Sequence, residues 1–344
     1  MSPHSGPRSS PFPKAGASPR TPERRFRGAP ERHGPAHRVL RAVVIASCVP
    51  YLSLKIAWIA GSRIGIPDGS VLLDNRALMA VANSVTVLMD GAVIVLALLL
   101  TQGWGRRVPA WLLAVPMWVA GGLLLPIMVG FPVQLLVKAF TDGGIERSTS
   151  EPFLDEWVFG VVYSGFIVQG LTLGTLFVLY AKERWGHVWR GRVWDLPSAA
   201  AGRLLKVCAA AAAVLALFPF TMRLLWACGA TTGLSHTRIE QRTADFYVLE
   251  GVSALFVAVA VAGALLIAFR PAPALPLKTP LAMAWVGSGA VGCWGIWLLI
   301  AAILPGPEDG ERATGLMALT YAVGMIVGLL VVTGTASFLR RRGA

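Results

Sequence analysis

Eight long apolar blocks constrain the fold of this chain more than any other feature of its sequence. A bilayer core of about 30 Å requires about 20 helical residues, and each block is about that long or longer. The blocks are continuously apolar, whereas the strands of a membrane barrel alternate between apolar and polar residues. The sequence therefore predicts an all-α fold, a polytopic transmembrane helix bundle with about eight spans. The expected spans cover residues 40–60, 77–102, 109–129, 154–181, 204–227, 244–269, 281–304 and 313–339.

Charged residues are scarce for a chain of 344 residues. They make up 14% of the sequence, whereas hydrophobic residues make up 55%. A soluble globular domain carries about 25% charged residues. This composition excludes an ordinary soluble enzyme and leaves lipid as the solvent for the apolar blocks.

The distribution of basic residues along the chain predicts its orientation in the membrane. The net charge is +13, and most Lys and Arg residues flank alternate ends of the expected spans. They occur before residue 42, at 106–107, at 182–206, at 270–278 and at 340–342, whereas intervening loops carry acids such as Glu146 and Glu308. Because cytoplasmic loops are enriched in Lys and Arg, both termini are predicted to be cytoplasmic in a multi-pass protein of the cell membrane. This topology and the attraction to anionic lipid explain the basicity, so no nucleic-acid partner is expected.

Residues 1–38 form a segment of different character. They are rich in Pro, Ser, Gly and Arg and poor in aliphatic side chains. Such a segment cannot bury enough apolar surface to fold alone, so we predict a disordered basic cytoplasmic tail. The tail is too long and too polar for the first region of a cleaved signal peptide, and we expect it to be retained.

The sequence also contains signs of an internal duplication. The first expected span ends in Lys55, Trp58, Gly61 and Gly65, and the fifth ends in Arg223, Trp226, Gly229 and Gly233, with the same spacing. The second and sixth spans share an acid followed by glycine, at Asp90 and Glu250, and residues 163–184 align without gaps on residues 321–342. We therefore predict two four-helix membrane repeats, residues 39–184 and 203–344, joined by a cytoplasmic linker at 185–202. Because each repeat has an even number of spans, the two repeats are expected to be parallel.

Four ionisable side chains lie inside the expected spans, namely Lys55, Asp90, Arg223 and Glu250. A charge near the centre of a bilayer costs about 2.5–3.5 kcal/mol on insertion scales, so each should have a partner or a wet cavity. The duplication predicts that Lys55 pairs with Asp90 and that Arg223 pairs with Glu250, all in the outer half of the membrane. A two-fold axis between the repeats would gather the four charges into one substrate-binding cluster together with Trp58 and Trp226.

Two interpretations of these charges remain open. In one, they are structural ion pairs that fix the register of the helices. In the other, they form a polar site, open to the outside, that binds an ion or a small polar solute and carries protons on Asp90 or Glu250. The glycine after each acid favours the second interpretation, because it permits close approach of a backbone or a ligand.

Motifs of catalytic chemistry are absent from the sequence. It contains no phosphate-binding Walker loop, no H-E-x-x-H zinc motif and no paired-aspartate motif for prenyl diphosphates. All five histidines fall in the tail or the expected loops, and the four cysteines form no C-x-x-C pair. We therefore expect that the protein is not an enzyme and that it holds no metal or other cofactor.

The stretch from Tyr51 to Gly65 and the excess of Arg over Lys, 25 against 6, are typical of a known group of proteins. In these features the chain resembles the uncharacterised multi-pass integral membrane proteins that are common in actinobacteria. The resemblance covers most of residues 39–342 and implies no activity.

The leading functional hypothesis is a transporter or permease for a small polar solute or ion, with the cluster of charges and Trp residues at its binding site. The alternative is a non-catalytic membrane assembly or signalling subunit in which the buried charges are structural ion pairs. Such a subunit would dock a cytoplasmic protein partner through the N-terminal tail or through the linker at 185–202. Under both hypotheses the lipid bilayer surrounds the protein.

Overall fold

The computed structural model describes residues 34–343 except 69, 71–72, 74–75, 141–153, 197–201, 241, 273 and 305–311. The chain from His33 to Ala344 forms one compact unit. The predicted tail at 1–38 lies largely outside the described residues, and so does part of the predicted linker at 185–202.

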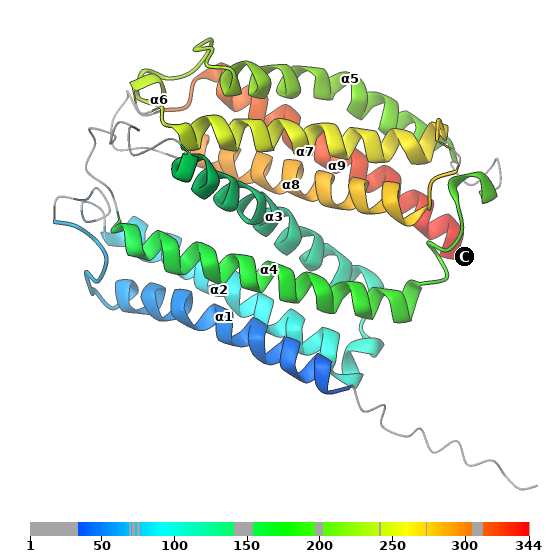
Figure 1. Ribbon diagram of the computed structural model, residues 1–344, viewed down its shortest axis with the longest axis horizontal. Coiled ribbons are helices and arrows are strands. Elements are labelled where there is room, and N and C mark those ends of the chain that lie inside the picture. Colours follow the sequence, from blue (N-terminus) through cyan, green and yellow to red (C-terminus); the bar gives the residue numbers. More distant parts are fainter. Residues whose placement is uncertain are drawn as a thin grey trace, which may run out of the picture. The chain divides into compact units, whose positions relative to one another are not determined.

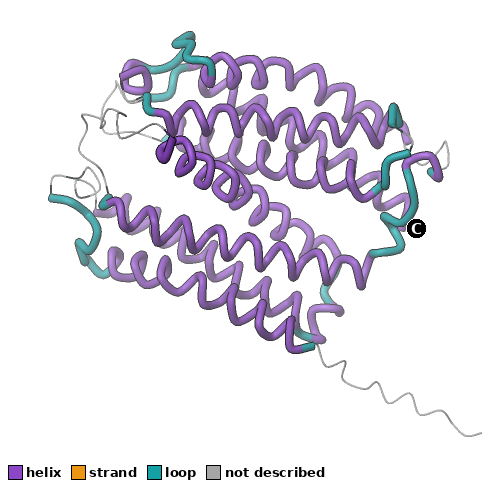
Figure 2. Tube along the Cα trace, viewed as in Figure 1, coloured by secondary structure: helices purple, strands orange, loops and turns teal. Residues whose placement is uncertain are grey.

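Long helices make up nearly all of the described chain (Figure 1). They are α1 (Pro35–Ile59), α2 (Arg76–Thr101), α3 (Ala110–Phe140), α4 (Glu156–Trp185), α5 (Gly202–Ala227), α7 (Ala244–Phe269), α8 (Lys278–Ile303) and α9 (Gly315–Gly343). Short helical segments with described bounds in the connections are η2 (Gly103–Arg107), η3 (Val193–Asp195) and α6 (His236–Glu240). Within the described ranges the chain contains no strand (Figure 2).

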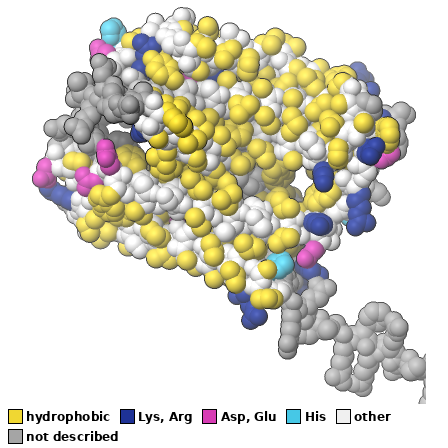
Figure 3. Space-filling model, viewed as in Figure 1, with side chains coloured by type: hydrophobic (Ala, Val, Ile, Leu, Met, Phe, Trp, Pro, Cys, Tyr) yellow, Lys and Arg dark blue, Asp and Glu magenta, His cyan; other side chains and the backbone are white. Residues whose placement is uncertain are grey.

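Each of the eight long helices is long and apolar enough to cross a membrane. Large apolar side chains such as Leu88, Val214 and Leu217 point outward and are exposed. Figure 3 shows hydrophobic side chains over most of one face of the bundle, with many of the Lys and Arg side chains near the end at which Figure 1 marks the C-terminus. A soluble protein rarely exposes such a continuous apolar surface. The predicted polytopic transmembrane helix bundle is confirmed, and the chain is an integral membrane protein.

The long helices form two groups that pack by the same scheme. α1 contacts α2 and α4, and α3 contacts α4. In the same way α5 contacts α7 and α9, and α8 contacts α9. A broad contact between α7 and α8 closes the second group, whereas α3 meets α2 only briefly and packs instead against α8 and α7. α3 therefore joins the two groups, and Figure 1 shows it running obliquely between α4 and the second group.

The same positions are buried in corresponding helices of the two groups. In α1 and α5 the buried pairs are Val44 and Ala212, Cys48 and Ala216, Leu54 and Met222, and Trp58 and Trp226. In α4 and α9 they are Gln169 and Val327, Leu173 and Val331, and Tyr180 and Phe338. The two groups thus turn equivalent helix faces toward their cores.

A tryptophan closes the turn after the first helix of each group. The indole N–H of Trp58 donates to the Ile64 carbonyl at 2.8 Å, and that of Trp226 donates to the Thr232 carbonyl at 2.9 Å. The donor and the acceptor are six residues apart in both turns. A buried indole N–H needs a hydrogen-bond acceptor. In both groups a carbonyl of the turn is that acceptor, so the two turns have the same hydrogen bond.

Glycines permit the backbone of these two turns. Gly61 and Gly229 have φ angles of 93° and 95°, and Gly65 and Gly233 have φ angles of 73° and 75°, which other residues rarely adopt. The Gly65 carbonyl accepts a hydrogen bond from the Asp155 amide, and the Gly233 carbonyl accepts one from the Thr314 hydroxyl. Each turn is thereby hydrogen-bonded to the residue that precedes the last helix of its group.

The two groups approach each other closely where α3 crosses α8. A Cβ atom at Gly122 would collide with the Gly289 carbonyl, and one at Gly289 would lie 3.2 Å from the Gly122 Cα atom. Beside this point the Trp118 indole N–H donates to the Ser288 hydroxyl at 3.0 Å. Glycine on both helices lets the two backbones touch, as is common between helices in membranes.

We expect the Gly122→Val variant to weaken the contact between the two groups. The added side chain would collide with the backbone of α8, and overpacking of this kind costs about 1–3 kcal/mol. Gly121→Val is the matched control, because a Cβ atom at Gly121 meets nothing within 4 Å. Unfolding of the purified protein in detergent, followed by tryptophan fluorescence, should give a lower midpoint for Gly122→Val alone. Equal midpoints would contradict the close crossing.

Candidate functional site

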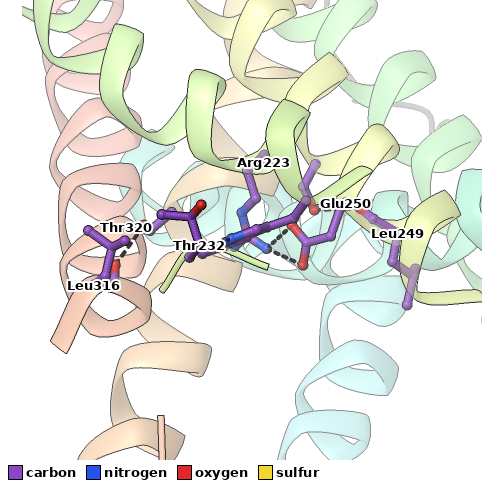
Figure 4. Close-up of polar contacts among 8 residues, drawn as sticks. Arg223, Thr232, Leu249, Glu250, Leu316 and Thr320 are labelled. Atoms are coloured by element: carbon purple, nitrogen blue, oxygen red, sulfur yellow. Dashed lines mark hydrogen bonds and ion pairs between the residues drawn. The ribbon is translucent and has the colours of Figure 1, made fainter. Parts of the chain in front are cut away.

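The second helix group contains the ion pair that the sequence predicts. Arg223 of α5 donates from Nη1 to Glu250 Oε1 at 2.9 Å and to Oε2 at 2.8 Å (Figure 4). Both side chains are 11% exposed. Each charge therefore has its opposite within hydrogen-bond distance, as a charge in apolar surroundings requires.

Aromatic rings complete the surroundings of Arg223. Its guanidinium carbon lies 5.9 Å from the centre of the Trp226 ring and 5.2 Å from the centre of the Tyr321 ring. Trp226 is fully buried, and its indole N–H is occupied by the Thr232 carbonyl. The faces of both rings are attractive to a cation, so they add to the stabilisation that Glu250 provides.

The first helix group uses a different partner for its cation. Lys55 Nζ donates to Asn83 Oδ1 at 2.9 Å, and it lies 5.0 Å from the centre of the Tyr51 ring and 4.8 Å from that of Trp58. The expected ion pair between Lys55 and Asp90 is wrong, since Lys55 binds Asn83 and influences Asp90 only through a longer-range Coulombic interaction.

The physical reason for this error is the register of α2. Asn83 binds Lys55 at the position where Glu250 binds Arg223 in the second group. Asp90 lies two helical turns further along α2. Seven residues return to nearly the same face of a helix, so the periodicity of the sequence does not separate the two positions. Burial agrees with the corrected register, in which the matching buried residues are Asn83 and Glu250, Asp90 and Val257, Val93 and Ala260, Ala97 and Ala264, and Leu100 and Ile267.

Asp90 instead meets an amide that the sequence reasoning overlooked. Gln169 Nε2 of α4 donates to Asp90 Oδ1 at 3.3 Å, and the two residues are 1% and 5% exposed respectively. Three buried polar atoms at this site have no partner, namely Asp90 Oδ2, Gln169 Oε1 and Asn83 Nδ2. The signal that could have identified Asn83 and Gln169 is an amide inside an apolar span, because it needs hydrogen bonds as a charge needs an opposite charge.

Further polar side chains lie between Lys55 and Asp90 along the interface of α1 and α2. Tyr51 of α1 lies near Thr86 of α2, whose hydroxyl donates to the Asn83 carbonyl of its own helix at 2.9 Å. Because Thr86 lies three residues after Asn83 and four before Asp90, all three share one face of α2. We call Lys55, Asn83, Tyr51, Thr86, Asp90 and Gln169 the polar column.

The second group has apolar side chains at the positions that correspond to Asp90 and Gln169. Asp90 corresponds to Val257, and Gln169 corresponds to Val327, which is fully buried. Cys48, which lies near Asp90, corresponds to Ala216. The shared packing scheme therefore holds a carboxyl and an amide in one group and aliphatic side chains in the other.

The structure does not bring the four charges into one cluster. Lys55 and Asp90 belong to α1 and α2, whereas Arg223 and Glu250 belong to α5 and α7, and these two helix pairs form no packing interface in the described chain. No hydrogen bond or ion pair between described residues joins the two sites. The expected cluster is replaced by two separate sites, because α3 stands between the groups.

Within the described ranges no three His, Cys, Asp or Glu side chains lie together as ligands for a metal ion. No protein-family model matches this chain, and neither a curated protein nor a solved structure does. The geometry of the two sites is therefore the basis for a functional proposal.

Breaking the pair of Arg223 and Glu250 from one side should destabilise the protein strongly. The Arg223→Met variant leaves a buried carboxylate without a partner, which costs about 3–5 kcal/mol. The double variant Arg223→Met/Glu250→Met should recover most of this loss, because no charge remains buried. Denaturant unfolding of each variant in micelles measures the difference.

The control for this experiment is Lys138→Met, which removes one partner of an ion pair with Asp245 at 2.9 Å. The Lys138 side chain is largely exposed, and exposed pairs contribute about 0–1 kcal/mol. If Arg223→Met costs no more than this control, the buried pair does not stabilise the fold.

Proposed function

We propose that this integral membrane protein is a transporter or permease for a small polar solute or ion, and that the polar column is its binding site. The observation that carries the proposal is the set of unpaired buried atoms, Asp90 Oδ2, Gln169 Oε1 and Asn83 Nδ2. Asp90 Oδ2 and Gln169 Oε1 are two acceptors on residues that bind each other, and Asn83 Nδ2 is a donor two helical turns away along α2. A small polar ligand or ion could supply the partners that these atoms lack.

Energetics support a binding role for these atoms. A polar group that loses water and gains no hydrogen bond costs about 2–7 kcal/mol, depending on the reference state. The second group avoids this cost at equivalent positions with Val257 and Val327. Packing alone does not require polar atoms at these positions of the first group. Residues that break the rules of packing are expected at functional sites.

Lys55 and Trp58 belong to the proposed site, at the end of the column away from Asp90. The Lys55 ammonium has one neutral acceptor, Asn83, and two aromatic rings, so no contacting anion cancels its charge. A cation with this environment can attract the anionic part of a solute. We assign binding roles to Lys55, Asn83, Asp90, Gln169 and Trp58.

Arg223, Glu250 and Trp226 fit a structural role better than the binding role that the sequence suggested. Both carboxylate oxygens of Glu250 accept from Arg223, and the Trp226 indole N–H donates to the Thr232 carbonyl, all within the second group. A closed pair of this kind fixes the register of α5 against α7. We therefore propose that transport depends on the first group and that the second group supports it.

We further propose that the two groups arose by duplication, as repeats over 39–184 and 203–344. The matched turns at Trp58 and Trp226, the shared burial pattern and the repeated packing scheme support this proposal. Equal orientation of the repeats would relate them by an axis along the membrane normal. The suggested kinship with actinobacterial membrane proteins stays a prediction.

The segment between the groups supports the alternative function, a membrane assembly or signalling subunit. Val193 donates to the Leu275 carbonyl at 3.0 Å and Leu277 donates to the Gly191 carbonyl at 3.1 Å, so the linker is held against the α7–α8 connection. Trp194 is exposed, with the Arg192 guanidinium 5.2 Å from its ring centre. An aromatic and a cation at this place suit the inner membrane surface or a cytoplasmic partner that also contacts the 1–38 tail.

A native cysteine can test the proposed orientation, with both termini in the cytoplasm of the cell. Cys228, directly after α5, is exposed, whereas Cys48, Cys208 and Cys293 are buried. We expect a membrane-impermeant maleimide to label Cys228 in right-side-out vesicles and the label to disappear in Cys228→Ser. Labelling only in inside-out vesicles would reverse the topology.

A ligand of the polar column should raise the thermal midpoint of the purified protein, because binding to the native state stabilises it. The probes are alkali-metal chlorides, inorganic phosphate, amino acids and simple sugars. We expect one class to raise the midpoint and to enter reconstituted vesicles, with uptake reduced about tenfold in Asn83→Ala, equivalent to about 1.4 kcal/mol.

Ser84→Ala is the matched control for this measurement. Ser84 neighbours Asn83 but is exposed, and its hydroxyl donates only to the Ala80 carbonyl of its own helix at 2.7 Å. Uptake should be unchanged in this variant. A flat response of the wild type to every class of probe would contradict the transport proposal.

A further inference from the structure

The first helix group contains a buried carboxyl that its packing scheme does not need. Asp90 and Gln169 occupy positions at which the second group has Val257 and Val327, and all four residues are buried. The second group folds with aliphatic side chains at these positions. A buried polar pair that is dispensable for packing points to a function for the carboxyl.

The groups that face Asp90 from α1 and α4 offer it a hydrogen bond but no ion pair. From α4, Gln169 Nε2 donates to Asp90 Oδ1 at 3.3 Å. From α1, the titratable groups near Asp90 are Cys48, Tyr51 and Lys55, and only Lys55 is a cation. Its ammonium group is bound to an amide oxygen at 2.9 Å rather than to the carboxyl.

The other elements packed against α2 add no charge beside Asp90. The only titratable side chain of α3 is Lys138, which pairs with Asp245 at 2.9 Å. The cations of η2, Arg106 and Arg107, follow the end of α2, which lies about 16 Å from Asp90 at 1.5 Å per helical residue. Among the described residues, Lys55 is therefore the one cation that interacts with Asp90, and it does so without contact.

An ionised carboxylate without a contacting cation is unfavourable in apolar surroundings, and such a group takes up a proton instead. A proton on Asp90 Oδ2 converts an unpaired acceptor into a donor. The unpaired Gln169 Oε1 is an acceptor on the very residue that already binds Asp90. Glu250 differs, because the guanidinium of Arg223 contacts both of its oxygens.

We propose that Asp90 binds an exchangeable proton and couples transport through the polar column to proton movement. This inference rests on the proposed transport function. The proton passes from the carboxylic acid to a water molecule, giving a carboxylate and a hydronium ion without electron transfer. When the proton leaves, the carboxylate keeps the Gln169 amide as its hydrogen-bond donor, and the Lys55 ammonium attracts it at longer range.

Hydroxyl groups line a route for this proton. Thr86 lies one turn before Asp90 on the same face of α2, its hydroxyl donates to the Asn83 carbonyl at 2.9 Å, and Tyr51 of α1 lies near it. The route continues to Asn83 and Lys55, where the column ends near the turn after α1. Hydroxyl groups both donate and accept hydrogen bonds, as proton relay requires.

Infrared difference spectroscopy of the full-length protein in lipid nanodiscs tests the proposal. A change from acidic to alkaline buffer should remove the carbonyl band of a buried carboxylic acid in the wild type, and this change should be lost in Asp90→Asn. The control is the double variant Arg223→Met/Glu250→Met, which keeps Asp90 and should keep the band change. An unchanged difference band in Asp90→Asn, or no band change in the wild type, would overturn the proposal.

A second variant copies the residues of the other helix group. Asp90→Val/Gln169→Val should accumulate in the membrane with at least wild-type stability and should lack the band change. Failure of this variant to fold would overturn the claim that the polar pair is dispensable for packing.

Vesicles that contain a trapped pH-sensitive dye separate the proton site from the transport function. An imposed membrane potential should drive proton entry with the wild type and not with Asp90→Asn. Solute uptake with no infrared signal from Asp90 would reject the proton site alone. An infrared signal from Asp90 without movement of solute or protons would reject the transport function that the inference rests on.

Discussion

A polar group inside a bilayer has no water to compensate for a missing partner, and the rest of the structure depends on this constraint. The backbone satisfies most of this need within helices, which is why the spans are long helices. Arg223 and Glu250 satisfy it through two hydrogen bonds and a full cancellation of charge. Lys55 satisfies it with the neutral Asn83 amide and two aromatic rings, and it keeps its charge. The two groups share a packing scheme but differ in their buried polar residues. The polar residues of the first group that have no complete set of partners are the candidate site.

The spans and the all-α fold could be predicted from the sequence, because a run of about 20 apolar residues has few other solutions. The pairing of Arg223 with Glu250 could also be predicted, since each charge needs an opposite charge in its own group. The partner of Lys55 could not. Asn83 and Asp90 lie on one face of α2, so only the position of α1 along α2 decides between them, and apolar contacts without distinctive residues set that position.

The predicted single cluster of charges was wrong for a similar reason. Small residues occur along several spans, so the sequence does not single out Gly122 and Gly289 as the place where α3 and α8 touch. Prolines at 116, 126 and 132 interrupt the hydrogen bonds of α3, which runs obliquely between the groups. This helix separates the two polar sites. Gln169 was overlooked because an amide has no formal charge, although burial imposes the same need for a partner.

The two sites respond differently to a proton. In the second group the cation and the anion cancel, and a proton on Glu250 would break a pair that is otherwise complete. In the first group a proton on Asp90 changes the net charge beside Lys55 by one unit, in surroundings where charges interact more strongly than in water. A proton on Asp90 acts among α1, α2 and α4 and has no counterpart in the second group. Because a ligand shifts a conformational equilibrium only through its unequal interaction with two arrangements, the proposed proton would act through this asymmetry.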